Sequence, residues 1–177
     1  MKTKLITLLL AVGGLLAMSS CLSKENKTWN DYEDWRTANN DWLEELELSG
    51  KYTRCVPVWN TKLNVSMRWL NDREENAGNL TPLYTSQVKV KYKGWLYDGT
   101  PFDSSYTQPD SCAILLPSNL IDGWVIALER MKVGDKVELI VPYQAAYQAS
   151  GYGSVPPFSN LRFEMELRDI PAYEIKP

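Results

Sequence analysis

The feature that most constrains the fold is an alternating strand that runs directly into a tight turn. In residues 88–97, VKVKYKGWLY, two valines and Tyr92 fall on one face and three lysines on the other, which is typical of a strand with one buried face. The Asp98-Gly99 pair that follows is a strong hairpin signal, because both central residues of such a turn must tolerate a positive φ. We therefore predict that the chain turns back here and pairs antiparallel.

Other segments extend this plan. LNVSMRWLN (63–71), KVELIVP (136–142) and NLRFEMELRDI (160–170) read as strands, and residues 120–131 place apolar side chains at helical spacing. Together they predict an α+β fold, in which a twisted antiparallel sheet packs its apolar face against one short helix.

The N-terminal part has a helical pattern of its own. Thr28 is a suitable N-cap and Gly50 a suitable stop, and between them Trp29, Trp35 and Trp42 recur at helical spacing among acidic and amide residues. This aromatic stripe has two interpretations. It is either a surface that holds a partner or substrate, or the buried side of a helix docked on its own domain, and the second is the more common situation.

The first twenty residues differ from the rest. Lys2 and Lys4 precede the apolar run LITLLLAVGGLLAM, which is short for a membrane span, and the run ends at Met18-Ser19-Ser20-Cys21. This pattern resembles a bacterial lipobox, which implies that Cys21 is lipidated and becomes the first residue of the mature chain. The alternative is a plain cleaved signal peptide. Loss of residues 1–20 removes two lysines and changes the net charge from −3 to −5, which argues against nucleic acid as a partner and against attachment to a membrane other than through the lipid.

The chain contains no histidine. This excludes Ser-His-Asp triads, histidine-activated cysteines and the usual zinc sites, so we expect neither a metal nor a cofactor. Cys55 and Cys112 would remain after export to a compartment in which disulfides persist. Whether they are bridged depends on their distance, which the sequence leaves open.

Read in order, the motifs resemble those of the FKBP-type (FK506-binding) peptidyl-prolyl cis-trans isomerases. The series begins with V-x-Y-x-G-x-L-x-D-G-x-x-F-D-S-S, continues through L-I-x-G-W, V-G-D-K and V-P-x-x-x-A-Y, and ends in V-P-P and L-x-F-x-x-E-L. It covers Val88 to Ile170, about half of the mature chain. The resemblance implies a half-barrel sheet wrapped around a short helix, with an N-terminal helical extension. The predicted divisions are a leader (1–20), a tether (21–27), the extension (28–62) and the isomerase domain (63–177).

The resemblance also implies a substrate pocket. Trp124 would form its floor, the backbone N–H of Ile121 and the Tyr147 hydroxyl would meet substrate carbonyls, and Asp103 would orient Tyr92 or stabilise the twisted amide. Asp103 has a simpler alternative role as a loop cap through Ser104 or Ser105. The residues expected to act in catalysis are Tyr92, Phe102, Asp103 and Tyr147, and those expected to bind substrate are Leu120, Ile121, Trp124, Val155 and Phe163.

Three departures from the family pattern affect the rim of this pocket. Gln148 stands where a glycine usually follows the pocket tyrosine, Ser111-Cys112-Ala113 replace a more aromatic strand, and the loop around Tyr152 matches loosely.

The function implied is prolyl isomerisation in exported polypeptides, with a non-catalytic chaperone or binding module as the alternative. The partners implied are proline-containing unfolded chains, a macrolide of the FK506 type and, through the N-terminal helix, a second copy in a homodimer. The implied location is the bacterial cell envelope, with the lipid in the outer membrane on its periplasmic side.

Overall fold

The computed structural model describes residues 27–174 and divides the chain into two compact units, residues 1–34 and 35–177. The predicted leader, Cys21 and most of the tether lie outside the described residues. In the first unit, residues 27–31 are helical. Helix α2 (Glu33–Leu48) starts in that unit, and from Trp35 onward it belongs to the second. In the described part of the chain, no helix is both long and apolar enough to cross a membrane.

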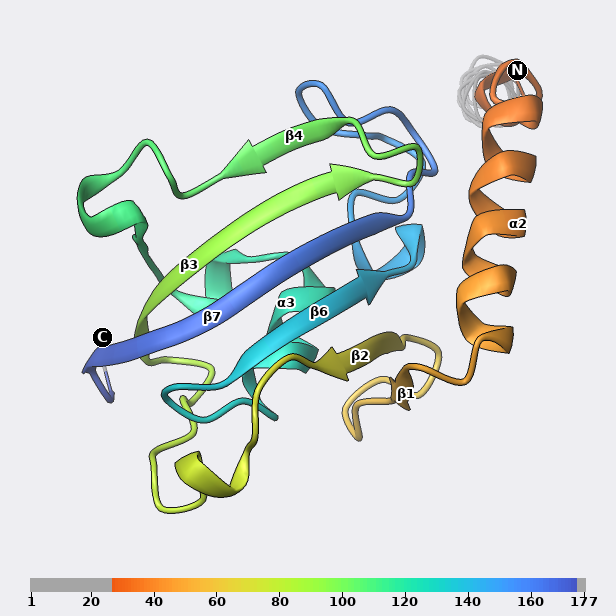
Figure 1. The fold of residues 1–177 in the computed structure, drawn as a ribbon. Helices are drawn as coiled ribbons and strands as arrows, with labels where there is room; N and C mark the ends of the chain where they lie inside the picture. The colour runs from red at the N-terminus through yellow and green to blue at the C-terminus, as the bar shows by residue number, and fades with distance from the viewer. Residues whose placement is uncertain (1–26, 175–177) are drawn as a thin grey trace, which may run out of the picture. The chain divides into compact units, whose positions relative to one another are not determined.

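The second unit is built on one antiparallel sheet (Figure 1). Its strand order is β1-β2-β6-β7-β3-β4, with β5 as a further partner of β3. Strand β7 lies between β6 and β3 and pairs with both along its length. The strands are β1 (Thr53–Cys55), β2 (Val65–Trp69), β3 (Gln87–Leu96), β4 (Pro101–Ser104), β5 (Ala113–Leu115), β6 (Lys136–Val141) and β7 (Leu161–Ala172).

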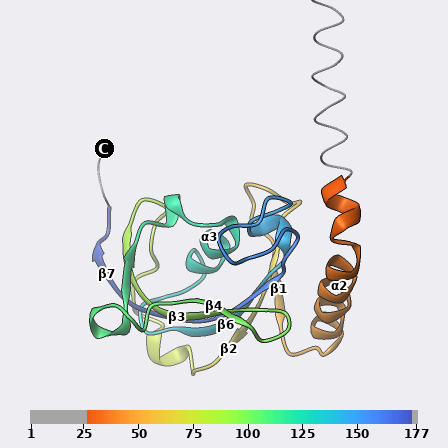
Figure 2. The same ribbon diagram turned by 90° about the horizontal axis from the view of Figure 1, so that it is seen from above.

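Helix α3 (Asp122–Leu128) lies inside the curve of this sheet (Figure 2). Six of its seven residues are buried. Four of them, Trp124, Ile126, Ala127 and Leu128, meet the alternating apolar residues of β2, β3, β6 and β7 in one core. Gly123 allows the close approach, because a Cβ at this position would lie 2.3 Å from Val141 Cγ1.

The strands and the helix predicted from the sequence are confirmed, and so is the α+β class. The predicted helix over 120–131 is shorter, because Leu120 and Ile121 are extended and the helix ends at Leu128. Strand β1 was not predicted: three residues leave too little alternation to detect, yet β1 pairs with β2 and adds residues before 63 to the sheet.

The hairpin after β3 is confirmed, but its geometry differs from the one expected. Gly99 has a φ of +85°, whereas Asp98 is not among the residues with positive φ. The Leu96 N–H donates to the Thr100 carbonyl, so the loop has three residues with glycine in the left-handed position. The Asp98 carboxylate accepts the Thr100 N–H at 2.9 Å and stabilises the loop.

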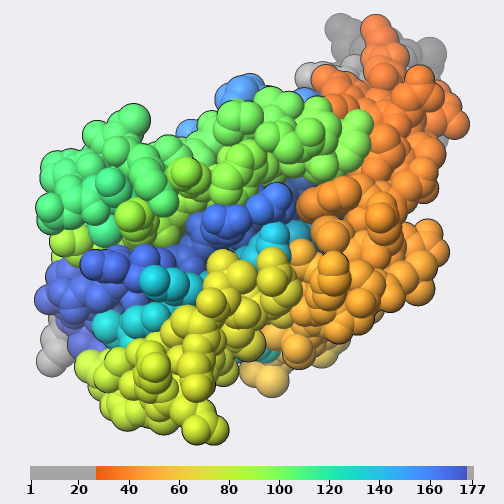
Figure 3. All heavy atoms as spheres, viewed as in Figure 1, coloured from red at the N-terminus to blue at the C-terminus, as the bar shows by residue number. Residues whose placement is uncertain are grey.

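The outer face of the sheet is polar. In the space-filling view, β4, β3, β7, β6 and β2 form side-by-side bands across it (Figure 3). The lysines of β3 lie on this side opposite the acidic residues of β7, with Lys91 in register with Glu166 and Lys93 with Glu164. The predicted division of β3 into an apolar and a lysine-bearing face is therefore confirmed, and any apolar site has to lie on the inner side.

Candidate active site

A cavity of about 390 Å³ opens on the inner side of the sheet beside the first residues of α3. Its size is within the range usual for small-ligand sites. Strands β3, β4, β5 and β7, the start of α3 and the loop after β6 all contribute to it. The lining residues are Tyr92, Asp103, Leu115, Asn119, Leu120, Ile121, Trp124, Tyr147, Tyr152 and Phe163.

The floor of the cavity is a cluster of edge-to-face aromatic rings. The Trp124 side chain is only 4% exposed, and its ring centroid lies 4.8 Å from that of Tyr92 and 5.3 Å from that of Phe163. The interplanar angles are 90° and 89°, which is the favourable T-shaped arrangement. Aromatic walls of this kind exclude water and lower the local dielectric, so polar interactions inside the cavity are strengthened.

Phe102 supports this cluster from behind. Its ring packs on Phe163 with centroids 5.6 Å apart, but it is not among the residues that line the cavity. Gly94 of β3 makes room for both rings, because a Cβ there would lie 2.8 Å from Phe163 Cε1 and 2.9 Å from Phe102 Cζ. Gly94 therefore allows the rings of Phe102 and Phe163 to pack directly against the backbone of β3.

Asp103 is bound to the wall of the cavity. The Tyr92 hydroxyl donates to Asp103 Oδ2 at 2.8 Å. The loop-capping role goes instead to Ser105, whose Oγ accepts the Tyr92 N–H at 2.9 Å and donates to the Ser111 carbonyl at 2.6 Å. Burial first, and then the hydrogen bond to Asp103, raises the pKa of Tyr92 well above its usual value. Tyr92 thus remains a neutral donor that fixes the carboxylate.

Two donors at the cavity have no partner in the part of the chain that the structure describes. The backbone N–H of Ile121 makes no hydrogen bond there, because Ile121 precedes the first turn of α3. The Tyr147 hydroxyl likewise makes none. Burial first, and then the nearby negative charge of Asp103, raises the pKa of Tyr147, so its hydroxyl keeps its proton. Both groups are available to a ligand that carries carbonyl oxygens.

The loop between β6 and β7 carries Tyr147 on a strained turn. Gln148 has a φ of +54°, a region that favours glycine. The Gln148 N–H donates to the Tyr143 carbonyl and its own carbonyl accepts the Phe158 N–H. Gln148 thus adopts a backbone conformation that is easier for glycine, and its two backbone hydrogen bonds stabilise this conformation.

The rim contains residues that the sequence interpretation did not assign. Tyr152 stacks on Tyr147 with centroids 5.1 Å apart and an interplanar angle of 16°, and Leu115 and Asn119 complete the lining. Tyr152 lies in a loop that resembles the family only loosely, so the motifs gave no basis for assigning it to the cavity. Leu115 is the last residue of the three-residue strand β5, which is too short for sequence alternation to indicate which side chains point inward. Val155, by contrast, is buried and pairs with Tyr152 across the loop, but it does not line the cavity.

Cys55 and Cys112 are free thiols in the structure. Cys55 is in β1 at one edge of the sheet, whereas Cys112 precedes β5 beyond β3. A disulfide needs Cα atoms within about 7 Å, and these cysteines belong to opposite ends of the strand order. The bridge that the sequence left open is therefore not formed.

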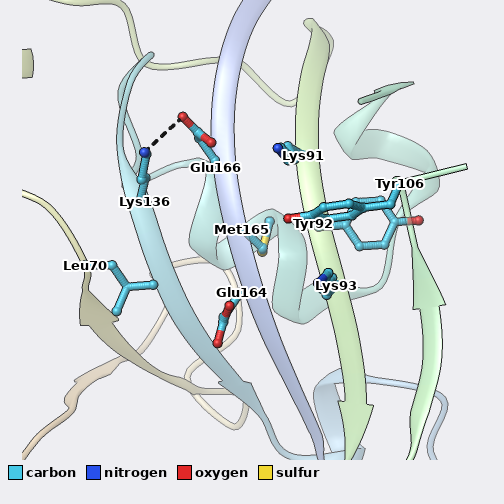
Figure 4. Close-up of a pocket in the computed structure, with 9 residues that line it drawn as sticks. All are labelled: Leu70, Lys91, Tyr92, Lys93, Tyr106, Lys136, Glu164, Met165 and Glu166. Carbon is cyan, nitrogen blue, oxygen red and sulfur yellow. Dashed lines mark ion pairs between the residues drawn. The ribbon is translucent and has the colours of Figure 1, made fainter. Parts of the chain in front are cut away.

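A second hollow, of about 160 Å³, lies on the outer face over β3, β6 and β7 (Figure 4). The ammonium groups of Lys91 and Lys93 lie 4.8 Å and 4.4 Å from the centroid of the Tyr106 ring. Lys136 forms an ion pair with Glu166 at 3.5 Å. These cations already have partners on the surface, so the aromatic cavity is the better candidate site.

Comparisons with known proteins identify the family and the fold. A model of the family of FKBP-type peptidyl-prolyl cis-trans isomerases matches residues 78–168. The FKBP-type 22 kDa peptidyl-prolyl cis-trans isomerase of Escherichia coli is 40% identical over 114 residues, which are 64% of this chain and 53% of that protein. FkpA of Escherichia coli is 38% identical over 99 residues, 54% of this chain and 36% of that one. The chain thus spans about half or less of the length of these curated relatives.

Solved structures with the same fold cover more of the chain. A peptidyl-prolyl cis-trans isomerase of Pseudomonas syringae superposes with a TM-score of 0.65 at 28% identity, over 78% of this chain and 95% of the other. The structure of FkpA from Escherichia coli gives a TM-score of 0.66 at 26% identity, over 95% of this chain and 72% of the other.

Proposed function

Since this chain belongs to the family of FKBP-type peptidyl-prolyl cis-trans isomerases, we propose that it accelerates the rotation of X–Pro bonds in polypeptides. The observation that carries the proposal is the aromatic cavity with two unused donors, the Ile121 N–H and the Tyr147 hydroxyl. The site offers no activated nucleophile, and bond rotation requires none.

Desolvation is the first contribution to catalysis. The barrier of about 18–20 kcal/mol arises because resonance gives the C–N bond partial double-bond character. The planar amide is more polar than the twisted one, so its transfer onto the Trp124 floor destabilises the ground state more than the transition state. An amide that loses water without compensation is destabilised by about 1–3 kcal/mol.

Directed hydrogen bonds are the second contribution. A bond from the Ile121 N–H or the Tyr147 hydroxyl to a substrate carbonyl is worth about 0.5–1.5 kcal/mol. The two contributions together reach about 2–4 kcal/mol, or roughly a hundredfold in rate. Faster turnover requires a cavity that is complementary to the twisted substrate. Asp103 supports this by holding the Tyr92 wall in place.

The proposal is tested with short X–Pro peptides and residues 22–177. We expect the parent to accelerate cis-to-trans conversion and a Phe102→Ala, Tyr147→Phe double variant to lose most of the effect while remaining folded. If the folded parent accelerates no peptide, whichever residue precedes proline, the isomerase proposal fails. The cavity would then be the binding groove of a non-catalytic module.

A macrolide of the FK506 type is the matching inhibitor. Its binding in the aromatic cavity should quench Trp124 fluorescence and abolish isomerisation in the same concentration range. Inhibition without competition against the peptide would place the ligand elsewhere and contradict this assignment.

We further propose that the substrates are exported polypeptides. The support is the leader pattern that ends at Cys21, which implies a lipid-anchored protein of the cell envelope. Labelling of the full-length chain with a fatty acid in cells, lost on Cys21→Ser substitution, is the expected result. Equal labelling of both chains would contradict the anchor.

A further inference from the structure

A second groove lies along another side of α3. Its volume is about 300 Å³, and it is lined by Trp59, Tyr84, Asp122, Val125 and Glu129. Val125 is 5% exposed and forms the floor, whereas Trp59 and Tyr84 are 47% and 53% exposed and form the walls. We call this feature the α3 groove.

The groove is built by one helix face and two fixed loops. Asp122, Val125 and Glu129 are spaced by three and four residues, so they share one side of α3. The Arg130 guanidinium donates to the Val56 carbonyl at 2.8 Å and to the Ile126 carbonyl at 2.7 Å, which fixes the loop before Trp59 to the end of α3.

The wall formed by Tyr84 is fixed on the opposite side. The Tyr84 carbonyl accepts the Ser118 N–H at 3.2 Å. The chain around both aromatic walls is thus tied to α3 or to the turn that precedes it, and the groove is a preformed feature of the fold.

The walls and the residues beside them expose large apolar side chains. Val58 and Leu83, next in sequence to Trp59 and Tyr84, are also exposed. Exposed apolar side chains that line a hollow with a polar rim, as those of Trp59 and Tyr84 do, are typical of sites that bind another molecule.

The α3 groove and the aromatic cavity lie on different sides of the same short helix. Leu120, Ile121 and Trp124 line the cavity, while Asp122 and Val125 line the groove. The two are separated by the width of one short helix, about 10 Å. Because the bound chain passes around the helix and not through it, its path is about 10–20 Å, and at about 3.3–3.6 Å per extended residue about three to six residues connect the two sites.

The charge of the rim favours a cation. Asp122 and Glu129 stand at the rim, and among residues 27–174 neither forms an ion pair. Glu129 receives only a long hydrogen bond of 3.4 Å from the Trp59 indole N–H. A lysine or arginine beside the bound apolar group would therefore meet two carboxylates that have no cationic partner.

We propose that the α3 groove binds a second stretch of the polypeptide whose X–Pro bond occupies the aromatic cavity. An aliphatic or aromatic side chain of that stretch packs on Val125 between Trp59 and Tyr84, and a neighbouring Lys or Arg pairs with Asp122 or Glu129. The inference rests on the proposed function and adds to it a preference for sequence about three to six residues from the proline.

Binding without proline tests the groove separately from catalysis. The probe is a fluorescein-labelled peptide that contains a Phe-Lys pair and no proline, and its affinity is measured by anisotropy. We expect Tyr84→Ala and Glu129→Lys each to weaken binding at least about fivefold. Tyr173→Ala, a tyrosine of similar exposure outside the groove, is the matched control and should bind like the parent.

Turnover provides the second measurement. With a tetrapeptide substrate, Glu129→Lys should isomerise at the parent rate, because the tetrapeptide is too short to reach the groove. With a twelve-residue substrate that carries Phe-Lys four residues from its proline, kcat/KM should fall about fivefold in Glu129→Lys. A Phe-Glu version of that substrate should reverse the ranking of parent and variant.

Equal affinity of the proline-free peptide for the parent, Tyr84→Ala and Glu129→Lys would overturn the inference while leaving tetrapeptide isomerisation intact. Dimers of the parent that dissociate in Tyr84→Ala by sedimentation, with no peptide bound, would assign the groove to a second copy and also overturn it. A parent that is inactive on all peptides but binds the probe would refute the isomerase function and leave the groove as a binding site.

Discussion

The two stacked tyrosines at the rim of the cavity differ in what their hydroxyl groups can do. Tyr147 offers an unpaired hydroxyl beside the Trp124 floor, whereas the exposed Tyr152 mainly covers the Tyr147 ring. In Tyr147→Phe the stack remains and one hydrogen bond to substrate is lost. We expect kcat/KM to fall about two- to tenfold, since such a bond is worth about 0.5–1.5 kcal/mol.

Tyr152→Phe is the control for this prediction and should retain the parent rate, with both variants melting at the parent temperature. Equal losses in the two variants would mean that the stack, and not the Tyr147 hydroxyl, supports turnover.

The same residues predict a flat pH profile. Burial raises the pKa of both Tyr92 and Tyr147, so their donor protons are lost only above the ordinary tyrosine range. The chain has no histidine. We expect kcat/KM to be constant from about pH 6 to pH 9, where no other ordinary side chain of the site titrates. A bell-shaped profile inside this interval would show that a proton-transferring group takes part.

Helix α2 is tied to the domain by an amide pair. Asn39 Oδ1 accepts the Asn160 N–H, and the Asn160 Nδ2 donates to the Asn39 carbonyl, both at 2.8 Å in a buried position. Asn160 Oδ1 also accepts the Tyr143 N–H at 2.8 Å, at the start of the loop that carries Tyr147. Asn160 thus connects α2 to the start of the loop that carries Tyr147.

Asn39→Ala would leave the buried Asn160 N–H without an acceptor. We expect the free energy of unfolding to fall by about 1–3 kcal/mol in urea titrations, and KM for short peptides to rise. The exposed neighbour Asn40 is the matched control, and Asn40→Ala should unfold like the parent. Loss of the same size in both would mean that helix propensity, not the amide pair, is responsible.

The sequence predicted elements better than their contacts. Alternation identified β3 and β7, and periodicity identified α2 and α3, because these patterns arise within each element. It did not reveal Asn39, whose partner is 121 residues away. It placed Phe102 and Val155 in the cavity from motif order, whereas neither is among the residues that line it, because lining depends on side-chain direction. Cys55 and Cys112 stayed undecided for the same reason, since only the strand order separates them.

At the scale of the whole molecule, α2 belongs to the second unit from Trp35 onward and is not a free arm there. Besides the amide pair, the Trp35 indole N–H donates to Ser159 Oγ at 3.1 Å, and its ring meets Tyr97 edge-on at 5.0 Å. The hydrogen bond and the ring contact both join Trp35 of the aromatic stripe to its own domain. They favour the docked interpretation of the stripe at this position.

Deletion of residues 28–48 tests that interpretation. We expect turnover of short X–Pro peptides and of an unfolded protein substrate to fall by the same factor, together with a lower melting temperature. A loss confined to the protein substrate would instead show that the helix holds clients.

The strands at the two ends of the sheet are very short. Strand β1 has three residues at one end, and β4 and β5 have four and three at the other. An exposed strand edge offers unpaired backbone groups on which another extended chain can add, and this is how many aggregates begin. The unfolded polypeptides proposed as substrates are such chains. Because its edge strands are so short, the sheet offers these chains little unpaired backbone on which to add, and it is a poor seed for their aggregation.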